Sequence, residues 1–130
     1  MNNDNTIEAL NIEPTQNTPE VSFDATRGRF EIKGRSLPEH AIEFYEPILE
    51  WIERYVRKPK DETLVLMDID YFNTPSAKPL LDILKSVDRL TQNGYKLSVQ
   101  WHYRNDDEDM KETGSEYAKL IQTPVELIGH

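Results

Sequence analysis

The stretch Leu64–Lys78, with the sequence LVLMDIDYFNTPSAK, changes character halfway along and so decides the fold. Its first four residues are apolar on both faces of an extended chain, which is typical of a central strand in a largely parallel sheet. We expect this strand to run to about Phe72. Thr74 and Pro75 then predict a helix start, with Thr74 as the N-cap and Pro75 at the first helical position. The stretch therefore places a strand-to-helix turn at the carboxyl edge of a sheet, where open α/β folds carry their sites.

Strands and helices alternate on both sides of this unit. The alternation from Val21 to Ile32, around a glycine-containing turn, predicts a β-hairpin. Ser36-Leu37-Pro38-Glu39 then predicts the start of a long helix with Ser36 as its N-cap. Apolar residues recur every three or four positions in that helix, and we expect this set to face inward: Ile42, Tyr45, Leu49, Ile52 and Val56.

The second helix is expected to end at Asn93-Gly94, a common C-terminal cap. A strand over Tyr95–Trp101, a helix reaching about Leu120 and a last strand over Val125–Ile128 follow. The predicted order is β-β-α-β-α-β-α-β, which implies a mixed α/β sheet with helices packed on it.

The domain organisation follows from length and composition. A chain of 130 residues fits one domain of ordinary size. Residues 1–18 are rich in Asn, Thr and Glu, so we expect a flexible N-terminal arm that docks through its apolar cluster around Ile7, Leu10 and Ile12. Residues 19–130 are then a single domain.

Charge and composition narrow the classes of partner. The formal net charge of −9 argues against nucleic acid and against anionic membranes, because both require a basic surface. The chain has no cysteine, which excludes disulfides and thiolate chemistry. We see neither a signal peptide nor the roughly 18 apolar residues that a membrane span requires. We expect a cytoplasmic protein.

Thr74 is the most informative polar residue. As an N-cap it would face the free N–H groups and the positive end of the helix dipole, which is a favourable place for a phosphate. Ordinary capping explains a threonine before a proline equally well, and the residues alone leave both interpretations open.

Asp68 and Asp70 are the other candidates for chemistry. Two residues apart on a strand, they point to one face and could bind a divalent ion or act as acid and base. No third ligand is evident, and the three histidines, at positions 40, 102 and 130, have no metal-ligand spacing. We therefore assign no catalytic residue, metal or cofactor, and keep a small metal-dependent enzyme as an alternative.

Four segments together resemble a known family. They are Thr18-Pro19, Gly34–Glu39, Phe44–Trp51 and Asp70–Lys78, and the Tyr-Phe-Asn-Thr run in the last of them is the most specific. The chain resembles the SiaC-type regulatory phosphoproteins, formerly a domain of unknown function. These are similar in fold to STAS domains, the anti-sigma-factor antagonists, so the resemblance implies a STAS-like mixed sheet.

The resemblance implies a phosphorylation site at Thr74. Pro75 and Pro79 depart from the family pattern, which makes Ser76 the alternative acceptor. The residues expected to contact partners are Asp70, Tyr71, Asn73, Thr74, Pro75, Ser76 and Lys78.

The resemblance also implies partners. A Ser/Thr kinase of the histidine-kinase-like ATPase class would phosphorylate the threonine, and a PP2C-type phosphatase would remove the phosphate. The unmodified, non-enzymatic protein would bind and activate a diguanylate cyclase, which links it to cyclic-di-GMP and to biofilm or aggregation behaviour. The alternative within this fold is an anti-sigma-factor antagonist that sequesters an anti-sigma kinase.

Overall fold

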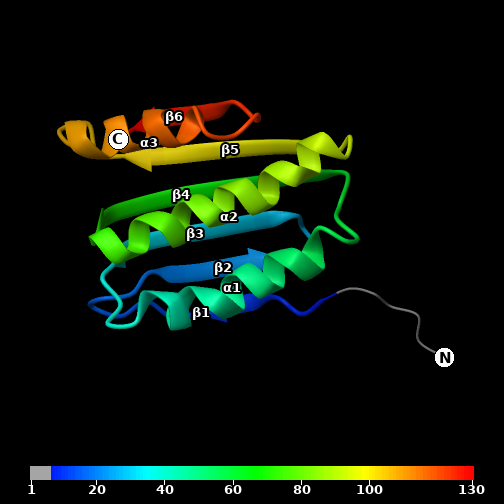
Figure 1. Cartoon of the computed structure of the whole chain (residues 1–130), viewed down its shortest axis with the longest axis horizontal. Helices are drawn as coiled ribbons and strands as arrows, with labels where there is room; N and C mark the ends of the chain where they lie inside the picture. The colour runs from blue at the N-terminus through cyan, green and yellow to red at the C-terminus, as the bar shows by residue number, and fades with distance from the viewer. Residues whose placement is uncertain (1–6) are drawn as a thin grey trace.

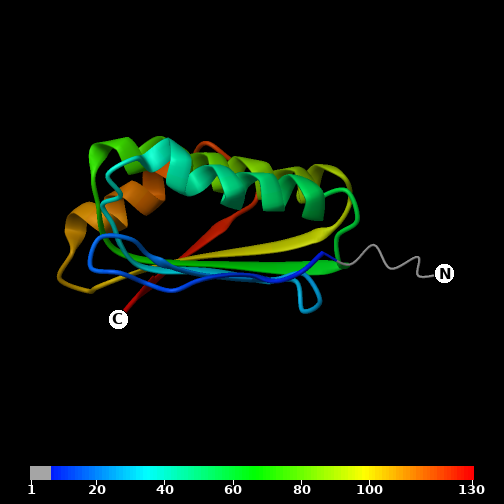
Figure 2. The ribbon, with the colours of Figure 1, turned by 90° about the horizontal axis from the view of Figure 1, so that it is seen from below.

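The computed structural model describes residues 7–130. Six strands form one mixed sheet in which the spatial order of the strands equals their order in the chain. Figures 1 and 2 show that the helices all cover the same face of this sheet. The mixed α/β class predicted from the sequence is confirmed.

The first part of the sheet is antiparallel. Strands β1 (Leu10–Ile12), β2 (Glu20–Asp24) and β3 (Arg29–Ser36) pair in sequence. The β2–β3 turn requires glycine at position 28, because its φ is 63° and a Cβ there would lie 2.5 Å from the Glu62 carbonyl oxygen. The predicted hairpin is confirmed.

Strand β1 departs from the predicted flexible arm. Leu10–Ile12 pair with β2, and the Trp51 indole N–H donates to the Glu8 carbonyl oxygen at 2.7 Å. Ile7, Leu10 and Ile12 pack against the core, so the predicted apolar cluster does dock. The sequence pattern missed the strand because three residues are too short for a recognisable alternation. Residues 1–6 of the predicted arm lie outside the described residues.

The second part of the sheet is parallel. Its strands are β4 (Glu62–Phe72), β5 (Lys96–Tyr103) and β6 (Val125–Gly129). Helix α2 (Thr74–Gln92) connects β4 to β5, and helix α3 (Glu108–Ala118) lies between β5 and β6. Strand β4 is central and runs parallel to both β3 and β5. Asn93 caps the end of α2, as predicted, and the φ of 88° at Gly94 begins the turn into β5.

Helix α1 (Ala41–Tyr55) begins later than the sequence suggested. The predicted N-cap, Ser36, is instead the last residue of β3 and is fully buried. His40 occupies the N-cap position without a side-chain capping bond. A capping-box pattern is local, whereas continued pairing of β3 with β4 as far as Ser36 and Phe72 holds this residue in the sheet.

The core lies between the sheet and the helices. Phe23, Phe30, Trp51 and Tyr55 form an aromatic cluster with ring centroids 4.7 to 5.7 Å apart. This cluster fixes α1 on the antiparallel half, while α2 covers the parallel half. In the part of the chain that the structure describes, no helix has the length and apolar character needed to cross a bilayer.

Candidate functional site

The turn between β4 and α2 is fixed from two sides. The Asn73 N–H donates to the Ser36 carbonyl oxygen at 3.0 Å, which ties the turn to the end of β3. The Asn73 side-chain oxygen accepts from the Ser76 N–H at 3.2 Å and from the Ser76 hydroxyl at 2.8 Å. Asn73 is therefore the N-cap of α2, and the predicted assignment of that position to Thr74 is wrong.

Thr74 is the first residue of the helix, followed by Pro75 in the first turn. Its side chain is exposed, and no hydrogen bond to its hydroxyl is found among residues 7–130. The first turn of α2 carries no acidic residue. A phosphate on Thr74 would thus lie at the positive end of a 19-residue helix with no carboxylate in that turn to oppose it.

Ser76 lies two residues after Thr74 and is fully buried. Its hydroxyl donates to the Ser36 carbonyl oxygen at 3.2 Å and accepts from the Ser36 hydroxyl at 2.8 Å. The Ser36 hydroxyl also lies 2.5 Å from the hydroxyl of Tyr45 on α1. Burial raises the pKa of Tyr45 to about 12, so this phenol remains a neutral hydrogen-bonding group. The network joins β3, α1 and α2 directly beneath the Thr74 turn.

The residues predicted to contact partners divide by exposure. Asp70, Tyr71, Pro75 and Lys78 are exposed near Thr74, and Tyr71 is 56% exposed despite its aromatic ring. Lys78 pairs with Asp82 at 2.8 Å, one turn further along α2. Asn73 is half-buried and Ser76 is inaccessible, so these two shape the turn from within.

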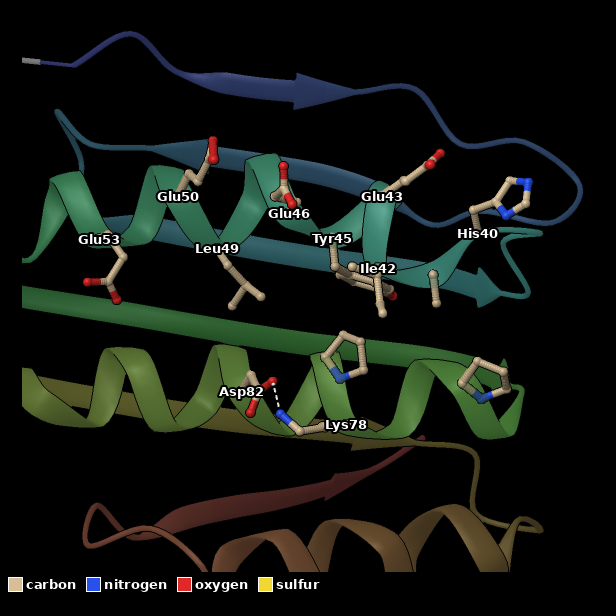
Figure 3. Close-up of a pocket in the computed structure, with 13 residues that line it drawn as sticks. His40, Ile42, Glu43, Tyr45, Glu46, Leu49, Glu50, Glu53, Lys78 and Asp82 are labelled. Carbon is tan, nitrogen blue, oxygen red and sulfur yellow. Dashed lines mark hydrogen bonds and ion pairs between the residues drawn. The ribbon is translucent and has the colours of Figure 1, made fainter.

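A groove between α1 and α2 begins beside this turn, and sequence reasoning missed it. It has a volume of about 910 Å³, and its lining includes Ile42, Leu49, Pro75 and Pro79. Figure 3 shows Ile42 and Leu49 pointing from α1 toward α2, and it shows Lys78 and Asp82 on α2.

Ile42 was predicted to face inward, and this is wrong: it is 78% exposed. The buried stripe of α1 is instead Ala41, Tyr45, Ile48, Trp51, Ile52 and Tyr55. Both stripes have helical spacing, but the observed one carries the large aromatic side chains that bury more area. The size of Trp51 and Tyr55 was the available signal.

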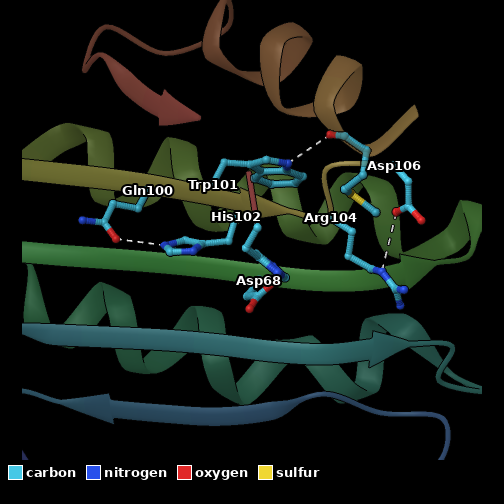
Figure 4. A network of polar contacts seen from close by, with 8 residues as sticks. Asp68, Gln100, Trp101, His102, Arg104 and Asp106 are labelled. Carbon is cyan, nitrogen blue, oxygen red and sulfur yellow. Dashed lines mark hydrogen bonds and ion pairs between the residues drawn. The ribbon is translucent and has the colours of Figure 1, made fainter. Parts of the chain in front are cut away.

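Asp68 and Asp70 lie on the sheet face opposite the helices. The Asp68 carboxylate is 3.3 Å from the His130 imidazole. On the neighbouring strand His102 contacts Gln100 at 3.0 Å (Figure 4). Among residues 7–130 no cluster of three or more His, Cys, Asp or Glu side chains has the geometry to hold a metal ion. The structure thus adds no third ligand to the pair of aspartates.

Comparison with known proteins identifies the family to which this chain belongs. The family model described as SiaC family regulatory phosphoprotein matches residues 12–130. The chain belongs to the SiaC family. An uncharacterized protein of Pseudomonas aeruginosa strain UCBPP-PA14 is 32% identical over 124 residues, which cover 93% of this chain and 96% of that protein.

Solved structures give the same assignment. SiaC of Pseudomonas aeruginosa matches with a TM-score of 0.86 at 28% identity, over 95% of this chain and 100% of the other. A crystal structure of the diguanylate cyclase SiaD in complex with its activator SiaC, from the same species, matches with a TM-score of 0.87 at 30% identity, over 93% of this chain and 99% of that one.

The predicted family and the predicted fold are both confirmed. The chain is a regulatory signalling protein and not itself an enzyme, so the metal-dependent enzyme built on Asp68 and Asp70 is set aside.

Proposed function

We propose that the unphosphorylated chain binds and activates a diguanylate cyclase in the cytoplasm and that phosphorylation of Thr74 releases the cyclase. A histidine-kinase-like Ser/Thr kinase adds the phosphate and a PP2C-type phosphatase removes it. Through the cyclase, the switch controls cyclic-di-GMP and biofilm or aggregation behaviour. The complex of SiaD with its activator SiaC supports a cyclase as the partner.

The observation that carries this proposal is the contrast between two neighbouring hydroxyls. Thr74 is exposed at the start of α2, whereas Ser76 is fully buried and bonded to Ser36 and Asn73. A kinase reaches Thr74 without unfolding the turn. Modification of Ser76 would require breaking the network beneath it, so Thr74 is the acceptor that we propose.

Charge and solvation give the direction of the switch. A phosphate adds about −1.5 to −2 charges at neutral pH, on a protein whose net charge is already −9. A partner that covers the Thr74 turn must strip water from this dianion, and burial of an unpaired charge costs far more than a surface contact returns. The phosphorylated complex therefore dissociates.

The test uses purified chain and the diguanylate cyclase of the same organism, with cyclic-di-GMP synthesis as the readout. Thr74→Glu should lower activation at least about tenfold, because it places a charge in the interface, while Thr74→Ala should activate like the wild type. Thr26→Glu is the matched control, since Thr26 is exposed in the β2–β3 turn. Because β3 runs parallel to β4, this turn lies at the end of the strands away from Thr74.

Mass spectrometry of protein from the native host should find one phosphate, on the peptide containing Thr74. Full activation by Thr74→Glu, or a phosphate on Ser76 in the folded protein, would contradict the proposed switch.

A further inference from the structure

The end of the sheet away from the Thr74 turn carries a concentration of basic side chains. Six exposed residues, on the last turn of α1 and on or next to three connections, make up this surface, which we call the basic end: Arg27, Arg54, Arg57, Lys58, Lys60 and Lys96. Figure 1 shows the β2–β3, α1–β4 and α2–β5 connections at one end of the sheet. None of the six forms an ion pair with another residue in the range 7–130.

Backbone hydrogen bonds join these connections. The Leu64 N–H donates to the Gly28 carbonyl oxygen at 2.8 Å, which ties the β2–β3 turn to the start of β4. The Lys96 N–H donates to the Asp61 carbonyl oxygen at 3.0 Å, which ties the α1–β4 loop to the start of β5. The cations therefore lie on one braced surface and not on independent loops.

The basic end differs in sign from the rest of the molecule. Two exposed carboxylates, Asp61 and Glu62, lie among the six cations, and the partly buried Asp24 accepts from the N–H groups of Thr26 and Arg27. Six cations against three carboxylates give this surface a net charge of +3, and the rest of the −9 chain then carries −12. Positive and negative charge are thus separated in space.

The distance between the two ends decides whether the acidic part cancels the basic end. Strand β4 runs from Glu62 at the basic end to Phe72 beside the Thr74 turn, which is about 33 Å, since a strand rises about 3.3 Å per residue. At physiological ionic strength charges are screened beyond about 8 Å. An anionic surface close to the basic end is therefore attracted by it. The expectation of no anionic-membrane partner came from the net charge and took no account of this separation.

We infer that the basic end binds an anionic lipid surface, with its lysines and arginines at the headgroup phosphates. Tyr95, which is 36% exposed, directly precedes Lys96 and adds an aromatic ring to the same surface. Such a ring, apolar with a polar tip, is favoured at the boundary between headgroups and acyl chains. This binding goes beyond the proposed function and involves neither Thr74 nor the cyclase.

The arrangement of the cations favours a flat partner over a narrow one. None of the six lines the groove between α1 and α2. A hollow of about 500 Å³ on the open face of the sheet is lined by Arg27 alone of the six, together with the carboxylates of Glu62 and Glu126. An acidic peptide would need a hollow lined by cations, whereas a planar surface needs none. Each Lys or Arg next to an anionic membrane strengthens binding about fivefold.

This orientation leaves the regulatory turn free. With the basic end on the lipid, the β4–α2 turn lies at the far end of β4, about 33 Å away, and faces the aqueous phase. Thr74 then stays accessible while the protein is held at the membrane.

The first test measures cosedimentation of the full chain with lipid vesicles. Vesicles with about 30% phosphatidylglycerol in phosphatidylcholine should bind it at least about tenfold more tightly than pure phosphatidylcholine. Binding should weaken between about 0.05 M and about 0.5 M salt, because the Debye length shortens. No binding to the anionic vesicles at low salt, or equal binding to both, would overturn the inference.

The second test reverses charge at either end of the molecule. Lys58→Glu together with Lys60→Glu should weaken binding to the anionic vesicles at least about tenfold. Arg104→Glu together with Lys111→Glu is the matched control, because it changes the net charge equally at exposed positions beside the other end of the sheet. Equal loss in both double variants would show that net charge alone matters and that the basic end has no special role.

The third test uses fluorescence. Trp51 and Trp101 are only 2% and 1% exposed, so their emission should not respond to vesicles. A tryptophan introduced as Tyr95→Trp should shift to shorter wavelength on anionic vesicles, because its ring enters the headgroup region. Ile42→Trp, at the start of α1 and 78% exposed in the native chain, is the control and should not shift. A shift in the control without one in Tyr95→Trp would contradict the proposed orientation.

The last measurement separates the lipid from other anionic partners. Duplex DNA and polyglutamate, at the same concentration of negative charge as the vesicles, should bind at least about tenfold more weakly. Tighter binding of either would assign the basic end to nucleic acid or to an acidic protein and overturn the inference. Lys58→Glu together with Lys60→Glu should also activate the cyclase normally in solution. Loss of that activation would place the basic end in the cyclase interface instead, whereas failure of the wild-type chain to activate any cyclase would affect only the proposed function.

Discussion

The first turn of α2 and the segment around Asp88, about four turns further along the same helix, differ in how their polar side chains are buried and hydrogen-bonded. Asp88 is only 4% exposed, and its carboxylate accepts from the Gln122 N–H, the Thr123 N–H and the Thr123 hydroxyl at 2.6 to 2.9 Å. Thr74 is exposed, and no hydrogen bond of its hydroxyl is found within residues 7–130.

The difference separates a structural group from a regulatory one. A buried carboxylate whose oxygens are all used holds the loop before β6 onto α2, and any change there costs stability. A hydroxyl that contributes nothing to the fold can gain and lose a phosphate while the fold stays intact. The comparison predicts that variants at Asp88 change stability, and that variants at Thr74 change binding.

Asp88→Ala should have the largest effect on stability. It removes three hydrogen bonds to a charged group and leaves buried donors of Gln122 and Thr123 without an acceptor. We expect a loss of about 3 kcal/mol in the free energy of unfolding, measured by urea denaturation. Cyclase activation at a temperature where the variant is folded should be retained. A loss below about 0.5 kcal/mol would break the comparison.

Ser76→Ala should come next. The substitution leaves the Asn73 side chain with one donor fewer and deprives the Ser36 hydroxyl of its acceptor, in a fully buried position. We expect about 2 kcal/mol of destabilisation by the same measurement. The kinase should still phosphorylate this variant at Thr74. Loss of phosphorylation in folded Ser76→Ala, with Thr74→Ala still phosphorylated, would move the acceptor to Ser76.

Local patterns predicted most of the fold because the signals for its elements are local. Three features could be predicted from spacing and caps: the apolar run from Leu64 that lies in β4, the helix after Asn73, and the end of that helix at Asn93. The parallel sheet followed from the alternation of strands and helices. The position of the candidate site at the β4–α2 turn was therefore available from the sequence.

The details that tertiary contacts decide were not available. Asn73 and Thr74 are both good N-caps, and the hydrogen bond from the Asn73 N–H to Ser36, distant in sequence, selects the first. The groove was missed because the sequence allowed two apolar stripes on α1, and the aromatic core around Trp51 selects the one that leaves Ile42 outside. Asp88 carried a readable signal, an acid four residues after the buried Leu84.

The pH dependence of stability should show a smaller effect, at Asp88. Burial alone raises the pKa of Asp88, but the hydrogen bonds from Gln122 and Thr123 outweigh burial and hold the pKa below its ordinary value of 3.8. The contribution of this carboxylate is then fully present above about pH 3.8 and is lost as pH falls through the lower folded pKa. Urea midpoints measured between pH 2 and pH 5 should fall less steeply with acid in Asp88→Asn than in the wild type. An identical slope in both proteins would contradict the shifted pKa.

The smallest effects separate the cap from the switch within a single turn. Asn73→Ala removes the acceptor for the Ser76 N–H and should cost about 1 kcal/mol. Thr74→Ala removes a hydroxyl for which no hydrogen bond is found in the described chain, and it should change the free energy of unfolding by less than about 0.5 kcal/mol. Cyclase binding should show the reverse pattern. Treatment with the kinase should still weaken cyclase binding by Asn73→Ala, and it should have no effect on binding by Thr74→Ala. Were Thr74→Ala the more destabilised of the two, the hydroxyl would be a structural cap after all, and the separation of stability from regulation along α2 would not hold.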